Sequence, residues 1–433
     1  MASRQITRLS CRSVFFRDIA ASFLPRPQAI LARSPRTPLG HDGTVPSVIR
    51  WRSGQVTAIR RTWPGAAELD VRVAEGGPAS DDTSADASGG ATRPAQGNAE
   101  NGDRTCRALA YTDLVGHPEE GDRVLLNTTA LDMGLGTGGY ALVVALPDRL
   151  PPDPDPAPGH LVKARYTPLQ TTVLGADEQD SPHHALLRDA DGVDGMPVVT
   201  ADLHSALPAI VAGIRDSRPE ARVVYVMLDG GALPAAFSRS VVALREAGLL
   251  AATVTVGQAF GGDLETVSVH TGLLAARHIL GADAAIVTQG PGNLGTGTRW
   301  GFSGVSTGEA VNATAVLGGH AVAALRVSEA DPRERHRGVS HHSLTAYGKV
   351  ALAPADIVVP QLPGAFGTRV RSDAAPLAER HLVVEVPIDG LRQALKDLPL
   401  RLSTMGRTLD ADAAYFLTAA AAGRHAASLI ASS

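Results

Sequence analysis

The chain has 433 residues, of which 44% are hydrophobic and 19% charged, a balance that excludes a largely disordered protein. The formal net charge of -4 and the aromatic content of 4% argue against a nucleic-acid partner, which needs a basic or base-stacking surface. Two cysteines, Cys11 and Cys106, are too few for a disulfide framework. No apolar run is long enough to span a bilayer. We therefore expect a cytoplasmic protein with no membrane partner.

Residues 1–47 are rich in arginine and serine, poor in acidic side chains, and without apolar periodicity. They lack the unbroken apolar core of a secretory signal peptide. Two interpretations are open. The segment is a disordered arm, or the start is assigned too early and the protein begins near Val45 or Val48.

A small β-barrel-like domain is predicted over residues 48–147. Stretches such as 53–63 and 67–75 alternate apolar and polar side chains, as half-buried strands do. The segment 76–103 consists largely of Gly, Ala, Ser and Asp and has little to bury, which predicts a disordered insertion within a hairpin. Residues 148–160 are rich in proline and predict a stiff linker.

The rest of the chain, 161–433, predicts a larger α/β domain with a mostly parallel sheet. Continuous apolar runs are typical of strands buried on both faces, and here they alternate with helical stretches. Asp202 is placed to cap the first of these helices. The expected strands are 196–201, 221–229, 251–258, 282–289, 320–328 and 381–387. The expected helices are 203–216, 235–250, 262–281, 308–319, 389–398 and 409–430.

Ligands of an open parallel sheet bind beyond the carboxyl ends of its strands, so the loops there are candidate sites. In the first, Asp229 ends a buried strand and Gly230 and Gly231 follow, which fits either a ligand loop or a plain tight turn. In the second, Asp263 is placed to cap a helix that carries His270 about two turns on. These two side chains form a ligand-facing pair, or else a cap and an ordinary helical histidine.

A glycine-rich loop after the strand 282–289 is the third candidate. It matches G-x-G-x-x-G, but no helix starts directly after it, and it lacks the lysine of a P-loop. Several glycines with small polar side chains can still direct backbone N–H groups at an anion. The substrate-binding candidates in this loop are Gly290, Gly292, Asn293, Gly295 and Thr298.

The fourth candidate is the stretch "DPRERHRGVSHHS", from Asp331 to Ser343. Arginine suits bidentate recognition of carboxylate or phosphate, so we expect an anion at Arg333, Arg335 and Arg337. His341 and His342 are candidates for a general acid or base, and Ser343 for a nucleophile. No H-x-x-x-H or H-x-E spacing occurs in this stretch, so no metal ligand is predicted.

Five stretches in one order resemble the bacterial domain-of-unknown-function family 3866. They read "VMLDGGALPAAFS", "GQAFGGDLETVSV", "GPGNLGTGTRWGFSG", "DPRERHRGVSHHSLTA" and "LSTMGR". The resemblance runs from about Val48 to the C-terminus, without the insertion 76–103. It implies a bacterial protein with one barrel-like and one α/β region, and it implies no established activity or cofactor.

Two functions fit these patterns. In the first, the α/β domain is a hydrolase or transferase that binds a small anionic metabolite between the loop 290–298 and the arginines, and a histidine moves a proton. In the second, the protein is a non-enzymatic ligand sensor or assembly factor. Because the strand 320–328 follows the glycine-rich strand by one crossover, we expect the stretch 331–343 to fold back near the loop 290–298.

Overall fold

The computed structural model describes residues 49–74, 104–136 and 138–431. The expected arm 1–47 and the whole of the expected insertion 76–103 lie outside these residues, and the structure leaves both predictions untested. Within the described residues, no helix is both long and apolar enough to cross a membrane.

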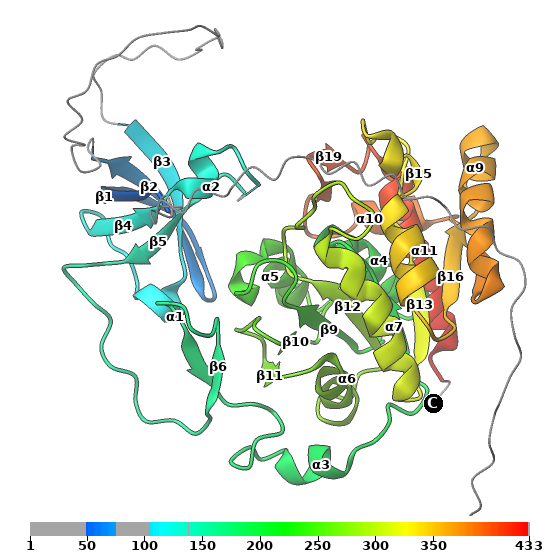
Figure 1. The fold of residues 1–433 in the computed structure, drawn as a ribbon, viewed down its shortest axis with the longest axis horizontal. Helices are drawn as coiled ribbons and strands as arrows, with labels where there is room; N and C mark the ends of the chain where they lie inside the picture. The colour runs from blue at the N-terminus through cyan, green and yellow to red at the C-terminus, as the bar shows by residue number, and fades with distance from the viewer. Residues whose placement is uncertain (1–48, 75–103, 137, 432–433) are drawn as a thin grey trace, which may run out of the picture. The chain divides into compact units, whose positions relative to one another are not determined.

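The first five strands form the predicted barrel (Figure 1). They are β1 (Trp51–Trp63), β2 (Ala66–Val73), β3 (Arg104–Ala110), β4 (Arg123–Asn127) and β5 (Ala141–Ala145), and they close in the order β1-β2-β3-β5-β4. Register shifts in β1, between Val56 and Ala58 and between Ile59 and Arg61, curve this long strand. Alternate side chains such as Leu69 and Val71 fill the interior, as the alternating pattern predicts. Two short helices, α1 (Thr112–Val115) and α2 (Thr129–Asp132), connect the strands.

An eight-stranded parallel sheet forms the larger domain and confirms the predicted α/β class. Its order is β11-β10-β9-β12-β8-β13-β16-β17. The strands are β8 (Pro197–Thr200), β9 (Val223–Leu228), β10 (Ala252–Val256), β11 (Leu264–Thr266), β12 (Ala284–Gln289), β13 (His320–Ala324), β16 (Asp356–Pro360) and β17 (Leu382–Val386). A small hairpin, β6 (Leu161–Lys163) and β7 (Thr171–Val173), precedes the sheet.

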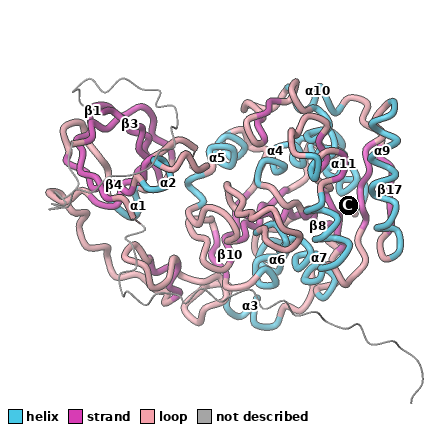
Figure 2. The backbone as a smooth tube through the Cα atoms, turned by 45° about the horizontal axis from the view of Figure 1, so that its top comes forward, coloured by secondary structure: helices cyan, strands magenta, loops and turns pink. Residues whose placement is uncertain are grey.

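Helices cover both faces of this sheet, and Figure 2 shows them around its strands. In β9, Tyr225 and Met227 pack into the core that contains α4 and α11, whereas Val224 and Val226 pack into the core that contains α6. Every residue of β9 is therefore buried, which explains its continuous apolar run. The helices are α3 (His184–Asp189), α4 (Leu207–Ser217), α5 (Arg239–Glu246), α6 (Val269–His278), α7 (Ser306–Val316), α9 (Gly364–Ala374), α10 (Leu391–Lys396) and α11 (Ala413–Leu429).

The chain leaves the adjacent strands β8 and β12 in opposite directions. After β8 it crosses to β9, and after β12 it crosses to β13 on the other side of β8. Such a reversal opens a crevice beyond the carboxyl ends of the two strands, where open α/β sheets bind ligands. The side chain of Gln289, at the end of β12, spans this point and donates a hydrogen bond to the Asp202 carbonyl after β8, at 2.9 Å.

Three expected features differ from the structure, and further elements were not predicted. The helix predicted over 262–281 begins only at Val269, because residues 264–266 add the edge strand β11 to β10. The strand predicted over 320–328 breaks after Ala324. Asp202 does not cap α4, which starts at Leu207 after a short 3-10 turn. Strand β16 and helix α9 were not predicted, although β16 is fully buried.

Candidate functional site

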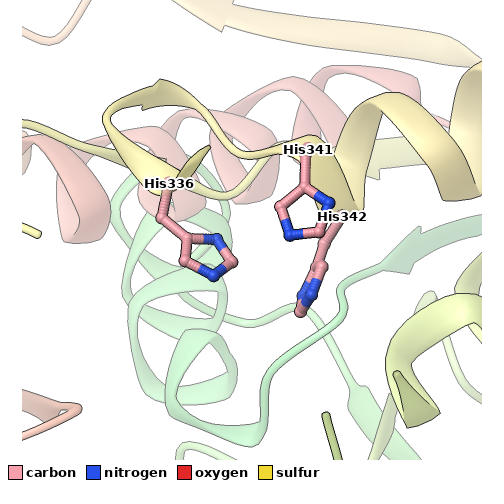
Figure 3. A group of neighbouring side chains, drawn as sticks. All are labelled: His336, His341 and His342. Atoms are coloured by element: carbon pink, nitrogen blue, oxygen red, sulfur yellow. The ribbon is translucent and has the colours of Figure 1, made fainter. Parts of the chain in front are cut away.

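Three histidines meet beyond the carboxyl ends of β8 and β13. The ring centroids of His341 and His342 are 4.4 Å apart, and the His336 ring lies 5.0 Å from the first and 4.9 Å from the second. Figure 3 shows the rings around one common space, with His336 on the facing loop. Each offers one ring nitrogen, and these three atoms lie within 4.8 Å of one another. Phe302 covers one side by stacking on the His342 ring at 3.8 Å.

A small hairpin brings His336 back over the other two histidines. Strands β14 (Val327–Ser328) and β15 (Gly338–Val339) pair antiparallel, and the 3-10 turn Glu334–His336 lies between them. Gly338 has φ +75, and a Cβ there would lie 2.2 Å from a carboxylate oxygen of Asp373. A side chain at position 338 would therefore displace the turn that carries His336.

Ser340 connects the turn to the short helix α8 (His341–Thr345). As the N-cap of α8, its Oγ accepts a hydrogen bond from the His342 N–H at 3.2 Å. The same Oγ lies 2.7 Å from His336 Nδ1. One serine thus fixes the start of the helix and the orientation of the third ring.

Two buried charged groups line the base of the cluster. Asp202 Oδ2 lies 3.5 Å from His342 Nδ1 and 3.7 Å from the Arg326 guanidinium. Burial opposes ionisation of Asp202, but the approach of His342 and the charge of Arg326 outweigh it and lower the carboxyl pKa. Among the described residues, Asp202 Oδ2 and His341 Nε2 are buried atoms without a close hydrogen-bond partner. A ligand, an ion or a water molecule at this position would supply the missing partner.

A buried ion network extends from this base. Asp331 accepts hydrogen bonds from Arg333 at 2.9 Å and from Arg407 at 3.1 Å, and it lies 3.7 Å from Arg326. Three guanidiniums and three carboxylates take part, so their formal charges cancel. The members of the buried ion network are Asp202, Arg326, Asp331, Arg333, Arg407 and Asp412.

Burial and nearby positive charge keep two of the histidines neutral. Burial, together with the positive charges of Arg326 and Arg333, lowers the pKa of His336 to about 3. Burial, His342 and Arg335 lower the pKa of His341 to about 4. At neutral pH each ring therefore keeps one nitrogen lone pair free to bind a proton or a ligand.

The three predicted anion-binding arginines have different surroundings. Arg333 is held by both oxygens of Asp331, and Arg337 lies near Glu334 at 3.9 Å, so neither guanidinium is free. Arg335 is exposed and makes no ion pair with any described carboxylate. Its Nη2 lies 3.8 Å from the position of a Cβ on Gly297, which confirms that the stretch 331–343 reaches the glycine-rich loop. We expected this contact because one crossover joins β12 to β13. The two strands are not direct neighbours, however, because β8 lies between them in the sheet.

The glycine-rich loop is itself a tight hairpin. Thr296 N–H donates to the Gly301 carbonyl at 2.7 Å, and Thr298 Oγ1 accepts from the Gly301 N–H at 3.1 Å. Asn293 Oδ1 accepts from the Gln289 amide and from the Ser303 hydroxyl, which anchors the loop to β12. Gly290 is buried beneath the loop, whereas Gly292 and Gly295 are exposed. The glycines near Arg335 are thus in the outer part of this hairpin.

The other candidates lie elsewhere or are already engaged. Asp229 accepts the Gln258 N–H at 2.9 Å and belongs to a βα turn, as the plain-turn interpretation holds. Gly230 and Gly231 follow it, and a Cβ at either would clash with Gln289 or with the Gly290 carbonyl. They permit close packing of the two loops.

The predicted Asp263–His270 pair is not formed. Asp263 binds the Thr253 N–H, near the amino end of β10, and pairs with Arg245 at 2.7 Å, so it caps no helix. His270 is exposed in the first turn of α6, which Ser268 caps. Ser343 is buried and accepts the Arg326 N–H at 2.8 Å, an arrangement that holds the chain and does not favour a nucleophile.

A family model described as "Protein of unknown function (DUF3866)" matches residues 107–423, which is most of the chain. The chain belongs to this family. The match confirms the resemblance found in the sequence motifs, and it includes the whole parallel sheet and the three histidines. No curated protein matches the chain, and no solved structure matches it.

Sequence reasoning missed four members of the site: Asp202, Phe302, Arg326 and His336. Asp202 and Arg326 each follow a parallel strand within two residues, and this was the signal that could have identified them. His336 was visible in the charged stretch, but its sequence spacing from His341 matches no metal or catalytic pattern. Only the β14–β15 hairpin brings these two rings together.

Another buried histidine, His204, makes a testable contribution to stability. Tyr225 donates its hydroxyl proton to the Gln289 carbonyl at 3.0 Å, so it accepts from His204 Nδ1 at 3.1 Å. His204 Nε2 therefore accepts from the Ser238 hydroxyl at 2.6 Å, and the ring is neutral. Burial lowers the pKa of His204 to about 4.

Because the unfolded chain protonates His204 near pH 6.5 and the folded protein only near pH 4, acidification favours unfolding. We expect this histidine to lower the free energy of unfolding by up to about 3 kcal/mol between pH 6.5 and pH 4. Urea unfolding of the wild type and of His204→Gln over this range measures the effect. The variant should show the shallower pH dependence, and equal slopes would contradict the assignment.

Proposed function

We propose that the carboxyl edge of the sheet binds a small anionic molecule and that the protein acts on it as a hydrolase or transferase. The observation that carries this proposal is Arg335. This exposed guanidinium has no described carboxylate partner, and it faces the glycine-rich loop and His341. A free guanidinium next to the backbone of a glycine-rich loop is suited to a phosphate or carboxylate.

The histidines supply the chemical part of the proposal. His341 is neutral at pH 7, because burial and its positive neighbours lower its pKa to about 4. A bound anion opposes these neighbours and raises the pKa of the ring, which makes it a better base once a substrate is present. Proton transfer by His341 or His342 then fits a reaction that activates a hydroxyl or a water molecule.

Arg335→Ala should weaken binding of an anionic ligand by about 1.5–3 kcal/mol, the value of a hydrogen bond to a charged group. Isothermal titration with inorganic phosphate and with ligands identified by mass spectrometry of co-purifying small molecules measures the loss. Arg337→Ala is the matched control, because this arginine lies in the same loop near Glu334. Equal losses in both variants would indicate a general surface-charge effect and would contradict a site at Arg335.

Measuring whether the protein converts its ligand distinguishes an enzyme from a non-enzymatic ligand sensor. An enzyme converts the identified ligand, and His341→Ala removes conversion while it retains binding. A ligand sensor binds the same molecule through Arg335 and leaves it unchanged. Incubation of the full chain with its ligand, followed by mass spectrometry, decides between these functions.

A further inference from the structure

We propose that His336, His341 and His342 form a binding site for a divalent transition-metal ion, with zinc as the best fit. Three imidazole nitrogens are a ligand set of zinc centres that keep one position open for water or substrate. Calcium and magnesium prefer oxygen ligands, so this nitrogen set disfavours them. The inference stands apart from the anion binding proposed at Arg335, because metal binding is measured without any substrate. A metal-bound imidazole nitrogen cannot also accept a proton, so the proton transfer proposed for His341 or His342 applies to the metal-free protein.

The geometry needs only a small contraction. In a tetrahedral centre with Zn–N bonds of about 2.0–2.1 Å, the ligand nitrogens lie about 3.3 Å apart. The three nitrogens here lie within 4.8 Å of one another. Modest ring rotations would close this gap. Nε2 of His341 is buried and has no hydrogen-bond partner among the described residues, so a metal bond would cost this nitrogen no existing interaction.

Two ligands have their second nitrogen held in the manner expected of metal sites. A metal-binding histidine usually donates its other ring N–H to a carboxylate, carbonyl or hydroxyl, which fixes the tautomer and the ring orientation. His336 Nδ1 lies 2.7 Å from Ser340 Oγ, and His342 Nδ1 lies 3.5 Å from the buried Asp202 carboxylate. His342 Nδ1 also lies 3.4 Å from Arg326 Nη1. In the tautomer that carries the proton on Nδ1 of both rings, the Nε2 lone pairs are free for an ion.

The charges around the cluster act on a dication in both directions: Arg326, Arg333 and Arg335 repel it, whereas Asp202 and Asp331 attract it. The buried ion network is neutral by formal count, and the two histidines with lowered pKa values add no charge at pH 7. A bound dication would add two positive charges beside the exposed Arg335. The open coordination position would then favour an anionic ligand or a hydroxide, because zinc lowers the pKa of its water to about 7. Phe302, stacked on His342, shields one side of the centre from solvent.

The test uses the full chain after treatment with a chelator. Titration with Zn²⁺ against a chromophoric competitor should give one tight site per chain, and Co²⁺ should produce the visible absorption of a tetrahedral complex. His341→Ala should weaken Zn²⁺ binding at least 100-fold and abolish the Co²⁺ bands. Asp202→Asn should weaken binding about 10- to 100-fold, as loss of a supporting carboxylate does. His270→Ala removes an exposed histidine of α6 and should change neither measurement.

His341 is only partly buried, so its alanine variant should keep the fold, which near-UV circular dichroism and the melting temperature verify. The proposal is overturned if the full chain shows no tight site, or if a folded His341→Ala protein binds Zn²⁺ as the wild type does. In either case the cluster is a packed set of neutral imidazoles. Phosphate binding in the presence of the chelator tests Arg335 separately, so one proposal can fail without the other.

Discussion

Replacing Asp331 with alanine is expected to lower the free energy of unfolding of the α/β domain by about 3–5 kcal/mol, the cost of breaking a buried ion pair from one side. The Asp331 side chain is fully buried and receives hydrogen bonds from Arg333 and Arg407. Burial opposes its ionisation, but these guanidiniums outweigh burial and hold the pKa of Asp331 well below its usual range. Its loss leaves Arg326, which is also buried, with one described carboxylate, Asp202 at 3.7 Å, in place of two.

Urea unfolding monitored by circular dichroism measures this change as a shift in midpoint at constant m-value. Asp189→Ala is the control, because Asp189 forms an exposed pair with Arg188 and should leave the midpoint unchanged. A small effect of Asp331→Ala, similar to that of the control, would show that solvent reaches the network and replaces the carboxylate.

Replacing Glu265 with alanine is the second large perturbation, with an expected loss of about 3–5 kcal/mol of unfolding free energy. This buried carboxylate accepts from the Gly261 N–H and the Thr255 hydroxyl, each at 2.6 Å, and lies 3.4 Å from Lys163 Nζ. Burial lowers the pKa of Lys163 and raises that of Glu265, so the pair is strongly desolvated. Removal of Glu265 leaves a buried ammonium without its counter-charge.

A conservative variant separates charge from hydrogen bonding. Glu265→Gln removes the negative charge but retains one acceptor oxygen, for the Gly261 N–H, and an amide N–H that can donate to Thr255 Oγ1, so it should destabilise less than Glu265→Ala. Lys163 keeps its hydrogen bonds to the carbonyls of Ala259 and Thr266 in both variants. Denaturant midpoints of the three proteins give the comparison. Equal midpoints for wild type and Glu265→Ala would contradict the importance of this pair.

The anion and the metal ion proposed for this site differ in how far the sequence predicts them. The anion-binding proposal began with the arginines and glycines of the sequence, and the structure narrowed it to Arg335. The metal proposal had no such origin, because the spacing of His336, His341 and His342 fits no known pattern. It arises only from ring distances and from the orientation that Ser340 and Asp202 impose.

By itself, the sequence determined the architecture of this protein. The alternating pattern of β1 is typical of a strand buried on one face, and the continuous apolar run of β9 is typical of a strand buried on both faces. These two patterns indicate a barrel followed by a parallel sheet. The same reasoning placed Asp229 and the glycine-rich loop after Gln289 at strand ends. The positions of strands and strand ends depend on interactions between residues a few positions apart. A sequence pattern extends over the same few positions, so it can predict them.

Only the tertiary structure decided the site and the ion pairs. Glu265 lies in a segment predicted as helix, yet Lys163, about a hundred residues earlier, and the edge of β10 hold it in a strand. His336 reaches His341 through a hairpin whose register depends on Gly338. Such contacts join segments distant in sequence, and their energies come from burial and charge pairing, which no local pattern encodes.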